Sequence, residues 1–257
     1  MERLNQPTKK GISKQQVFLV GMLFLLAGVI SRSVLQNRIL YMGSITNQQL
    51  LETLSASDRA AITATIALVL QALETCAIPI FAFLLVDEYE KSKNRKKMLL
   101  YFLLAAALSE IPYNYAMCGN LFHMTSQNPV FAMVIGVAVL YFFNRYRENS
   151  FANVLIRIFV GMASVLWVVM LNVDHGVALL VVTMTMWLLR KKKHFLTLFG
   201  GMASSACMLV SPFYIASAMG ILPVYLCREE EPTDPTPLPY LIYPLLLLAV
   251  GLLPNLI

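Results

Sequence analysis

Residues 174–193, DHGVALLVVTMTMWLLRKKK, decide the fold class of this chain. An apolar run at residues 176–189 follows a short polar turn and stops at four consecutive basic residues. Apolar segments of this kind are typical of membrane spans, and the Lys and Arg residues that flank spans stay on the cytoplasmic side. The stretch therefore predicts a span at residues 174–189 whose carboxyl end faces the cytoplasm.

Eight further apolar stretches repeat this arrangement. They lie at residues 15–35, 62–86, 98–113, 129–143, 154–172, 194–210, 212–226 and 239–256. If the N-terminus is cytoplasmic, only Arg32, Arg38 and Arg59 of the 20 Lys and Arg residues fall on the outer side. The sequence therefore predicts an all-α, polytopic transmembrane helical bundle of about nine spans, with the N-terminus inside and the C-terminus outside.

Composition excludes several classes of protein. Hydrophobic residues make up 58% of the 257 residues and charged residues 13%, about half the usual share in soluble domains. The net charge of +6 is spread over short loops without interleaved aromatic residues, so we expect contact with membrane lipids and not with nucleic acid. The spacing of the four cysteines fits neither a zinc site nor a disulfide framework, and no metal is expected.

The domain organisation follows from the same pattern. Residues 1–14 are polar and basic and are expected to form a disordered cytoplasmic tail. Residues 15–257 are expected to form a single membrane domain, and residues 46–57 an amphipathic helix on the outer surface.

Ionisable and amide side chains within or beside the spans are candidates for function, because burying them in lipid is costly. Glu74 lies near the middle of the second predicted span, where it is either neutral and hydrogen-bonded or faces a polar cavity. The others are predicted near the outer leaflet: Glu110, Asn114, Asn128, Asp174 and His175. A His beside carboxylates is typical of proton transfer. Alternatively, Asp174 and His175 are solvated in a turn, and Glu110 binds a backbone amide freed by Pro112.

Several segments resemble the TraX family. They are Ile78-Pro79-Ile80-Phe81-Ala82-Phe83, Ser109-Glu110-Ile111-Pro112, Gln127-Asn128-Pro129-Val130-Phe131, Asp174-His175-Gly176 and Tyr240-Leu241-Ile242-Tyr243-Pro244. The resemblance defines a TraX-like core at residues 62–257. It implies a protein of the bacterial cytoplasmic membrane associated with conjugation and with pilin acetylation, distantly similar to membrane-embedded acyltransferases.

The resemblance also implies roles for residues. Acetyl-CoA is the implied acyl donor, and a peptide, glycan or other amine or hydroxyl compound the acceptor. His175, Asp174 and Glu110 are then the candidate catalytic residues. Lys93, Arg95, Lys96, Arg190 and Lys191 are the candidates for contact with the phosphates of the coenzyme. Glu74, Thr75, Asn114, Asn128 and Tyr243 are expected to line the cavity.

Two other functions remain open at this point. Three positions that carry ionisable side chains in the family correspond to Leu23, Thr75 and Leu246 in this chain. The chain is therefore alternatively a catalytically eroded acyltransferase fold that serves as a subunit or partner of another membrane protein. A third possibility is a small transporter in which Glu74 is the proton or cation site.

Overall fold

The fold of the chain was analysed in a computed structural model, which describes residues 11–42, 44–122, 125–231 and 235–252. In chain order the elements are α1 (Lys14–Ile30), η1 (Ser31–Ile39), α2 (Asn47–Ala56), α3 (Asp58–Thr75), α4 (Ala77–Lys91), α5 (Arg95–Cys118), α6 (Val130–Arg145), α7 (Phe151–Met170), α8 (Gly176–Leu189), α9 (Lys193–Ala206), η2 (Cys207–Leu209), η3 (Pro212–Gly220), α10 (Ile221–Leu226) and α11 (Leu238–Leu252). Within the described ranges the only β pairing consists of two isolated bridges, so the all-α prediction is confirmed.

The first helix changes type partway along its length. Ser13 caps α1, accepting a hydrogen bond from the Gln16 backbone while the Gln16 side chain accepts one from Ser13. From Ser31 to Ile39 the helix continues as a π-helix, η1, in which the Leu40 amide donates to the carbonyl five residues earlier. Such wide turns are uncommon and occur frequently at functional sites. This one contains Arg32.

The predicted second span forms two helices, α3 and α4, that meet at Cys76. Pro79 has no N–H with which to continue the hydrogen bonding of α3, so the helix is interrupted there. The short 3-10 helix η3 packs against this junction at Gly220, where a Cβ would collide with the Cys76 carbonyl. The interruption leaves Glu74 in the last turn of α3, buried inside the protein.

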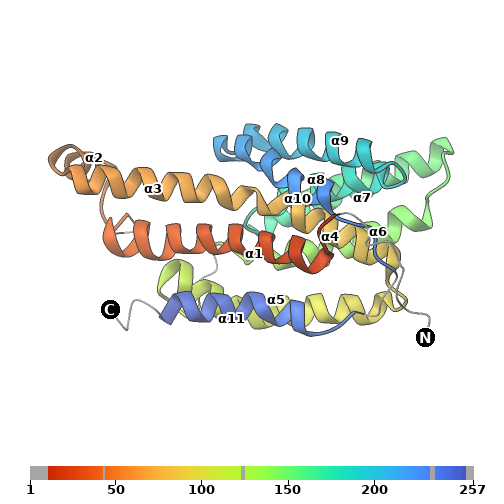
Figure 1. Cartoon of the computed structure of the whole chain (residues 1–257), viewed down its shortest axis with the longest axis horizontal. Coiled ribbons are helices and arrows are strands. Elements are labelled where there is room, and N and C mark those ends of the chain that lie inside the picture. The colour runs from red at the N-terminus through yellow and green to blue at the C-terminus, as the bar shows by residue number, and fades with distance from the viewer. Residues whose placement is uncertain (1–10, 43, 123–124, 232–234, 253–257) are drawn as a thin grey trace, which may run out of the picture.

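The helices lie roughly along one long axis (Figure 1). α5 and α11 pack together on one side, α1 lies beside them against α3 and α4, and α7, α8 and α9 form the opposite side (Figure 1). α1 and α11 run in the same direction along this axis (Figure 1). The hydrophobic core, which includes Ile80, Leu140 and Leu180, lies between these helices.

The outer surface of the bundle is strongly apolar. α7 buries only Gly161, Ser164 and Val168, which share one face, and exposes large side chains such as Phe159 and Trp167. Such extensive exposed apolar surface marks a membrane protein. In the described part of the chain, three helices are long and apolar enough to cross a bilayer: Lys14–Ile39, Asp58–Lys91 and Phe151–Met170. The number of nine spans and their direction therefore stay predictions.

Two further expectations concern the termini and the outer segment. The predicted tail lies mostly outside the described residues, but its last part does not: Ile12 exchanges hydrogen bonds with Leu226 and Arg228. Residues 12–14 are therefore held against the loop before α11, and the disordered tail stays a prediction. The helix expected at residues 46–57 forms as α2, with Thr46 as its capping residue. All four cysteines are free thiols.

Candidate functional site

Four charged or ionisable side chains from three distant parts of the sequence meet inside the bundle. Arg32 is at their centre: its Nη1 donates to Asp174 Oδ2 at 2.5 Å, and its Nη2 donates to Glu74 Oε1. His175 lies on the other side of the carboxylates, with Nε2 3.5 Å from Glu74 Oε1 and 3.7 Å from Asp174 Oδ1. We call Arg32, Glu74, Asp174 and His175 the charge cluster.

Glu74 is the most deeply buried member, with 2% of its surface exposed. It reaches the cluster because α1 has a glycine opposite it: a Cβ on Gly28 would overlap the Glu74 carboxyl group. Arg32 follows Gly28 by four residues and so lies on the same face of the helix, beside the carboxylate. The close approach of α1 and α3 at this glycine therefore positions the ion pair.

The loop before α8 presents Asp174 and His175. It is fixed by main-chain hydrogen bonds to Gln127: the Gln127 amide donates to Asn172 O at 3.0 Å, and the Asp174 amide to Gln127 O at 2.9 Å. The Tyr113 hydroxyl donates to Asp174 Oδ2 at 3.0 Å. His175 has a φ of +54°, a left-handed conformation that costs about 1 kcal/mol or more for a residue other than glycine. The fold therefore holds His175 in a strained position at the start of α8.

The two ring nitrogens of His175 have different surroundings. Nδ1 lies 2.8 Å from the hydroxyl of Tyr214, which comes from η3. Nε2 is buried and has no hydrogen-bond partner among the described residues, although both carboxylates are close to it. Tyr214 thus orients the ring through one nitrogen and leaves the other available, which is the arrangement that a proton acceptor requires.

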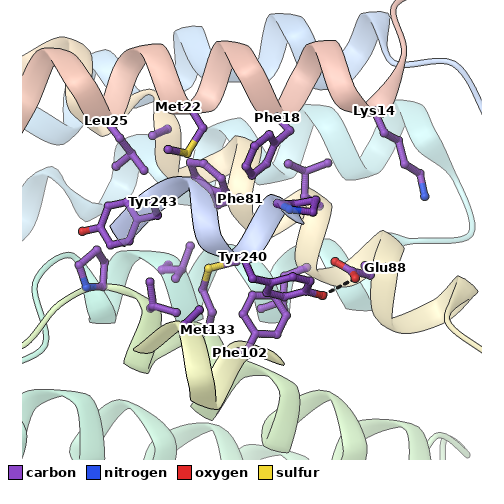
Figure 2. A pocket seen from close by; sticks show the side chains of 18 of the residues that line it. Lys14, Phe18, Met22, Leu25, Phe81, Glu88, Phe102, Met133, Tyr240 and Tyr243 are labelled. Atoms are coloured by element: carbon purple, nitrogen blue, oxygen red, sulfur yellow. Dashed lines mark hydrogen bonds between the residues drawn. The ribbon is translucent and has the colours of Figure 1, made fainter. Parts of the chain in front are cut away.

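A cavity of about 360 Å³ begins at the charge cluster, where Glu74 and His175 line it. It follows one face of α1 through Leu25, Met22, Phe18 and Lys14, a distance of about 16 Å at the rise of an α-helix. Aromatic and aliphatic side chains make up most of the remaining wall. Phe81 lies beside Met22 and Phe18 of α1, Phe102 and Met133 lie on the opposite side, and Tyr240 and Tyr243 lie between (Figure 2). The cavity is therefore a long apolar channel with an ionisable end.

Charged groups surround the far end of the cavity, which we call the mouth. Lys14, Lys91, Glu88 and Glu230 belong to its lining. Both lysines pair with Asp87, and the Tyr240 hydroxyl donates to Glu88 (Figure 2). The mouth therefore carries no excess of positive charge, and the Tyr240 side chain lies across it.

The cluster also has the composition of a possible metal site. Ligand atoms of Glu74, Asp174 and His175 lie within 4.8 Å of one another. The guanidinium of Arg32, however, already binds both carboxylates and supplies the positive charge that a metal ion would provide. A divalent cation beside this guanidinium is electrostatically unfavourable, so we interpret the cluster as an ion-pair network with an adjacent imidazole.

Glu110, Asn114 and Asn128 form a separate group. Glu110 accepts hydrogen bonds from the Asn128 side chain at 2.6 Å and from the Asn114 side chain at 3.3 Å. The Asn128 backbone amide also donates to Glu110, and the Asn128 side-chain oxygen accepts from the Val130 amide at the start of α6. None of the three lines the cavity. Their contacts fix the loop that holds Gln127, and through it the loop of Asp174.

The remaining predicted residues are divided between the cavity and the surface. Tyr243 lines the cavity. Thr75 is not part of the cavity lining; its hydroxyl donates to the Phe213 carbonyl at 3.2 Å. Lys93, Lys96 and Lys191 are exposed. Arg95 lies over the Tyr89 ring, and Arg190 pairs with Glu90 and lies 3.9 Å from the Trp187 ring centre. None of these five basic residues lines the cavity.

Sequence reasoning missed two members of the site. Arg32 was counted only as one of three basic residues on the outer side, although it lies within the predicted first span, where a charge is costly and indicates function. That signal was sufficient to include it. Tyr214 gave no comparable signal, because a tyrosine among apolar residues is ordinary in a membrane helix.

Comparison with known proteins agrees with the resemblance found in the sequence. The family model described as TraX protein matches residues 20–254, which include every helix from η1 to α11 and all four residues of the charge cluster. No curated protein and no solved structure matches the chain. Because the match covers most of the sequence, the chain belongs to the TraX family.

Proposed function

We propose that this protein transfers an acetyl group from acetyl-CoA to an amine or hydroxyl acceptor at the bacterial cytoplasmic membrane. The observation that carries the proposal is the single cavity that joins the charged mouth near Lys14 to His175 and Glu74. A thioester with a long, flexible arm requires such a channel: the arm occupies the apolar walls, and the acyl group reaches the ionisable end.

His175 is the proposed general base. The acceptor nitrogen or oxygen attacks the thioester carbonyl, and its proton passes to Nε2 of His175, the nitrogen without a hydrogen bond. Arg32, Glu74 and Asp174 together carry one net negative charge, so the protonated imidazole brings the cluster to neutrality. When the carbon–sulfur bond breaks, the proton passes from His175 to the leaving thiolate, which leaves as a thiol.

The proposed oxyanion donor is Tyr243. Its side chain lines the cavity, and among the described residues its hydroxyl forms no hydrogen bond. A hydroxyl that is free to donate stabilises the negative charge that develops on the thioester oxygen. Glu74 and Asp174 act on the imidazole, and Arg32 holds both carboxylates in place through its two contacts.

The phosphates of the coenzyme have to bind outside the cavity lining. At the mouth the two lysines face Asp87, Glu88 and Glu230, which offset their charge. Lys93 directly follows Ser92, a lining residue, and Lys96 lies one turn further on. We propose that these exposed lysines, with Arg95, Arg190 and Lys191, attract the phosphates from the cytoplasmic side.

The cavity also fits a multi-pass topology with both substrates at one site. In the predicted orientation the mouth near Lys14 is cytoplasmic, where acetyl-CoA is available, and the loop of Asp174 and His175 is nearer the outer leaflet. The acceptor, a peptide or glycan, then approaches from the outer side or from the lipid phase. The channel along α1 removes the need for either substrate to cross the bilayer.

The test is acyl transfer in proteoliposomes. Purified protein receives acetyl-CoA with a labelled acetyl group and a panel of acceptors that includes a peptide with a free N-terminus and an amino sugar. Release of coenzyme thiol is followed in parallel, in a Cys118→Ser background, because Cys118 is the exposed cysteine. We expect His175→Ala to lower the rate by about a hundredfold or more, the usual contribution of a general base.

His194→Ala is the matched control, since His194 is exposed and lies outside the site. His175→Asn separates chemistry from folding, because Asn tolerates the left-handed backbone at this position. The proposal fails if wild-type protein transfers no label above the His175→Ala background with any acceptor.

Two observations favour a non-catalytic alternative. Both carboxylates of the charge cluster are bound by Arg32, as in a structural ion-pair network, and α7 exposes a broad apolar face. A membrane subunit that binds a partner protein through this face has both features. Purification in mild detergent distinguishes the two functions: a stoichiometric partner together with inactive protein supports the subunit role.

A further inference from the structure

A second, smaller pocket of about 300 Å³ lies where the end of α4, the start of α5 and the end of α6 meet. Its lining consists of Tyr89, Arg95, Tyr141, Asn144 and Arg145. It shares no lining residue with the cavity of the charge cluster. On α4, Glu88 lines that cavity, and the next residue, Tyr89, lines this pocket. The pocket is therefore a separate feature of the fold.

Hydrogen-bond donors without partners gather in this pocket. Tyr89 is 1% exposed, and its buried hydroxyl has no hydrogen-bond partner in the described part of the chain. Within the described residues, the side chains of Tyr141, Asn144 and Arg145 also form no hydrogen bond or ion pair. A buried hydroxyl that lacks a partner costs free energy, so its presence beside a pocket indicates a missing acceptor.

Arg95 is held in place at the same pocket. Its Nε donates to the Tyr89 carbonyl at 3.2 Å, and its guanidinium carbon lies 4.5 Å from the centre of the Tyr89 ring. These contacts fix the plane of the guanidinium and leave its two terminal nitrogens free to donate. A fixed guanidinium of this kind suits the paired oxygens of a phosphate group.

The charge of the pocket is positive. Its lining contains two arginines and no carboxylate. Two glutamates flank Tyr89 on α4: Glu88 lines the cavity of the charge cluster, and Glu90 pairs with Arg190 at 3.1 Å and also accepts from the Trp187 ring. The start of α5 adds the positive end of a 24-residue helix, while Lys91 and Arg145 offset the negative ends of α4 and α6.

We propose that this pocket binds a phosphate ester group, held by Arg95 and Arg145 and by the hydroxyl of Tyr89. The phosphate belongs either to the headgroup of an anionic lipid or to a soluble compound such as the nucleotide part of a coenzyme. The chemistry is the same for both sources. The pocket shares Arg95 with the proposed phosphate contacts of the coenzyme but uses no residue of the charge cluster, so the inference does not depend on acyl transfer.

The experiment uses the full chain in nanodiscs of neutral phosphatidylcholine. One arm measures binding of adenosine 3′,5′-bisphosphate, added in solution, by calorimetry. The other arm replaces part of the phosphatidylcholine with phosphatidylglycerol and measures, by native mass spectrometry, which lipid stays bound. The variants are Arg145→Gln, which removes a charge, and Tyr89→Phe, which removes only the hydroxyl. Arg147→Gln is the control, with the same loss of charge two residues away.

We expect Arg145→Gln and Tyr89→Phe each to lower the affinity for one of the two probes about fivefold or more, which is the usual effect of losing a charge-assisted or buried hydrogen bond. If the variants weaken the binding of the bisphosphate, the natural ligand is a soluble phosphate ester. If they weaken the binding of phosphatidylglycerol, the ligand is a lipid headgroup. The inference is overturned if neither probe binds the wild-type protein, if both variants bind like the wild type, or if Arg147→Gln weakens binding as much. His175→Ala leaves the result unchanged, so failure of the proposed acyl transfer is recognised separately.

Discussion

Replacing Arg32 with Gln tests the arrangement on which the candidate site depends. Arg32 donates to Glu74 and to Asp174, and Glu74 is almost completely buried. The substitution keeps a side chain of intermediate length but removes the positive charge. Two carboxylates then face each other in the interior without a cation, next to His175.

The expected loss follows from the geometry. Removing one partner of a buried ion pair costs about 3–5 kcal/mol, because the other charge stays buried and unpaired. Here the lower part of that range is appropriate, because about a fifth of the Arg32 side chain, 21%, is exposed. For a chain of this size each kcal/mol corresponds to roughly 2–4 °C in the unfolding temperature, so we expect a decrease on the order of 10 °C.

The assay is thermal unfolding of purified protein in a mild detergent, followed by the fluorescence of the two tryptophans. Arg38→Gln is the matched control, because Arg38 lies on the same π-helix and its one polar contact within the described ranges is a 3.4 Å hydrogen bond to the Gly251 carbonyl. A triple variant, Arg32→Gln with Glu74→Gln and Asp174→Asn, removes all three charges together. We expect it to recover much of the lost stability, since no buried charge is left unpaired.

Two results refute the reasoning. If Arg32→Gln lowers the unfolding temperature no more than Arg38→Gln, the guanidinium is not the counter-ion of the buried carboxylates. If the triple variant is as unstable as Arg32→Gln, the loss comes from packing or from backbone geometry in η1 and not from unpaired charge.

Three further predictions follow from the site and the topology. Tyr214→Phe removes the hydrogen bond between the Tyr214 hydroxyl and Nδ1 of His175, worth about 1 kcal/mol. We expect the rate of acyl transfer to fall roughly fivefold and its pH profile to shift, while the unfolding temperature changes little. Gly28→Ala places a methyl group against the Glu74 carboxyl and lowers stability by about 1–3 kcal/mol, measured by thermal unfolding; an unchanged unfolding temperature contradicts the close approach. A reporter enzyme fused after Ile257 is active outside the cytosol if the predicted direction is correct, and cytosolic activity reverses the topology.

Most helices were predictable because the pattern of apolar runs is local. The helices α5 to α8 and α11 lie within a few residues of the stretches marked by hydrophobicity. The division of the second stretch at Cys76 was not predicted, although Pro79 supplies the local reason. The π-helix at residues 31–39 was not predicted either, because a π-helix and an α-helix have the same apolar composition and differ only in hydrogen bonding.

The candidate site was predictable in part. Glu74, Asp174 and His175 were singled out because an ionisable group within or beside an apolar span is exceptional. Their meeting point was not predictable, since the topology placed Glu74 at mid-membrane and the other two in an outer loop. Glu110 was grouped with them by its predicted depth, but its contacts are with Asn114 and Asn128.

The sequence by itself determined that the chain is helical and apolar, that it belongs in a membrane, and which ionisable residues are unusual. These properties depend on composition and on periodicity along single segments. Only the tertiary structure decided that Arg32 neutralises Glu74 and Asp174, that Tyr214 orients His175, and that a channel along α1 reaches them. The physical reason is that ion pairs, hydrogen bonds and cavities form between segments far apart in the chain. Their geometry depends on how closely the helices pack, as at Gly28, which no single segment specifies.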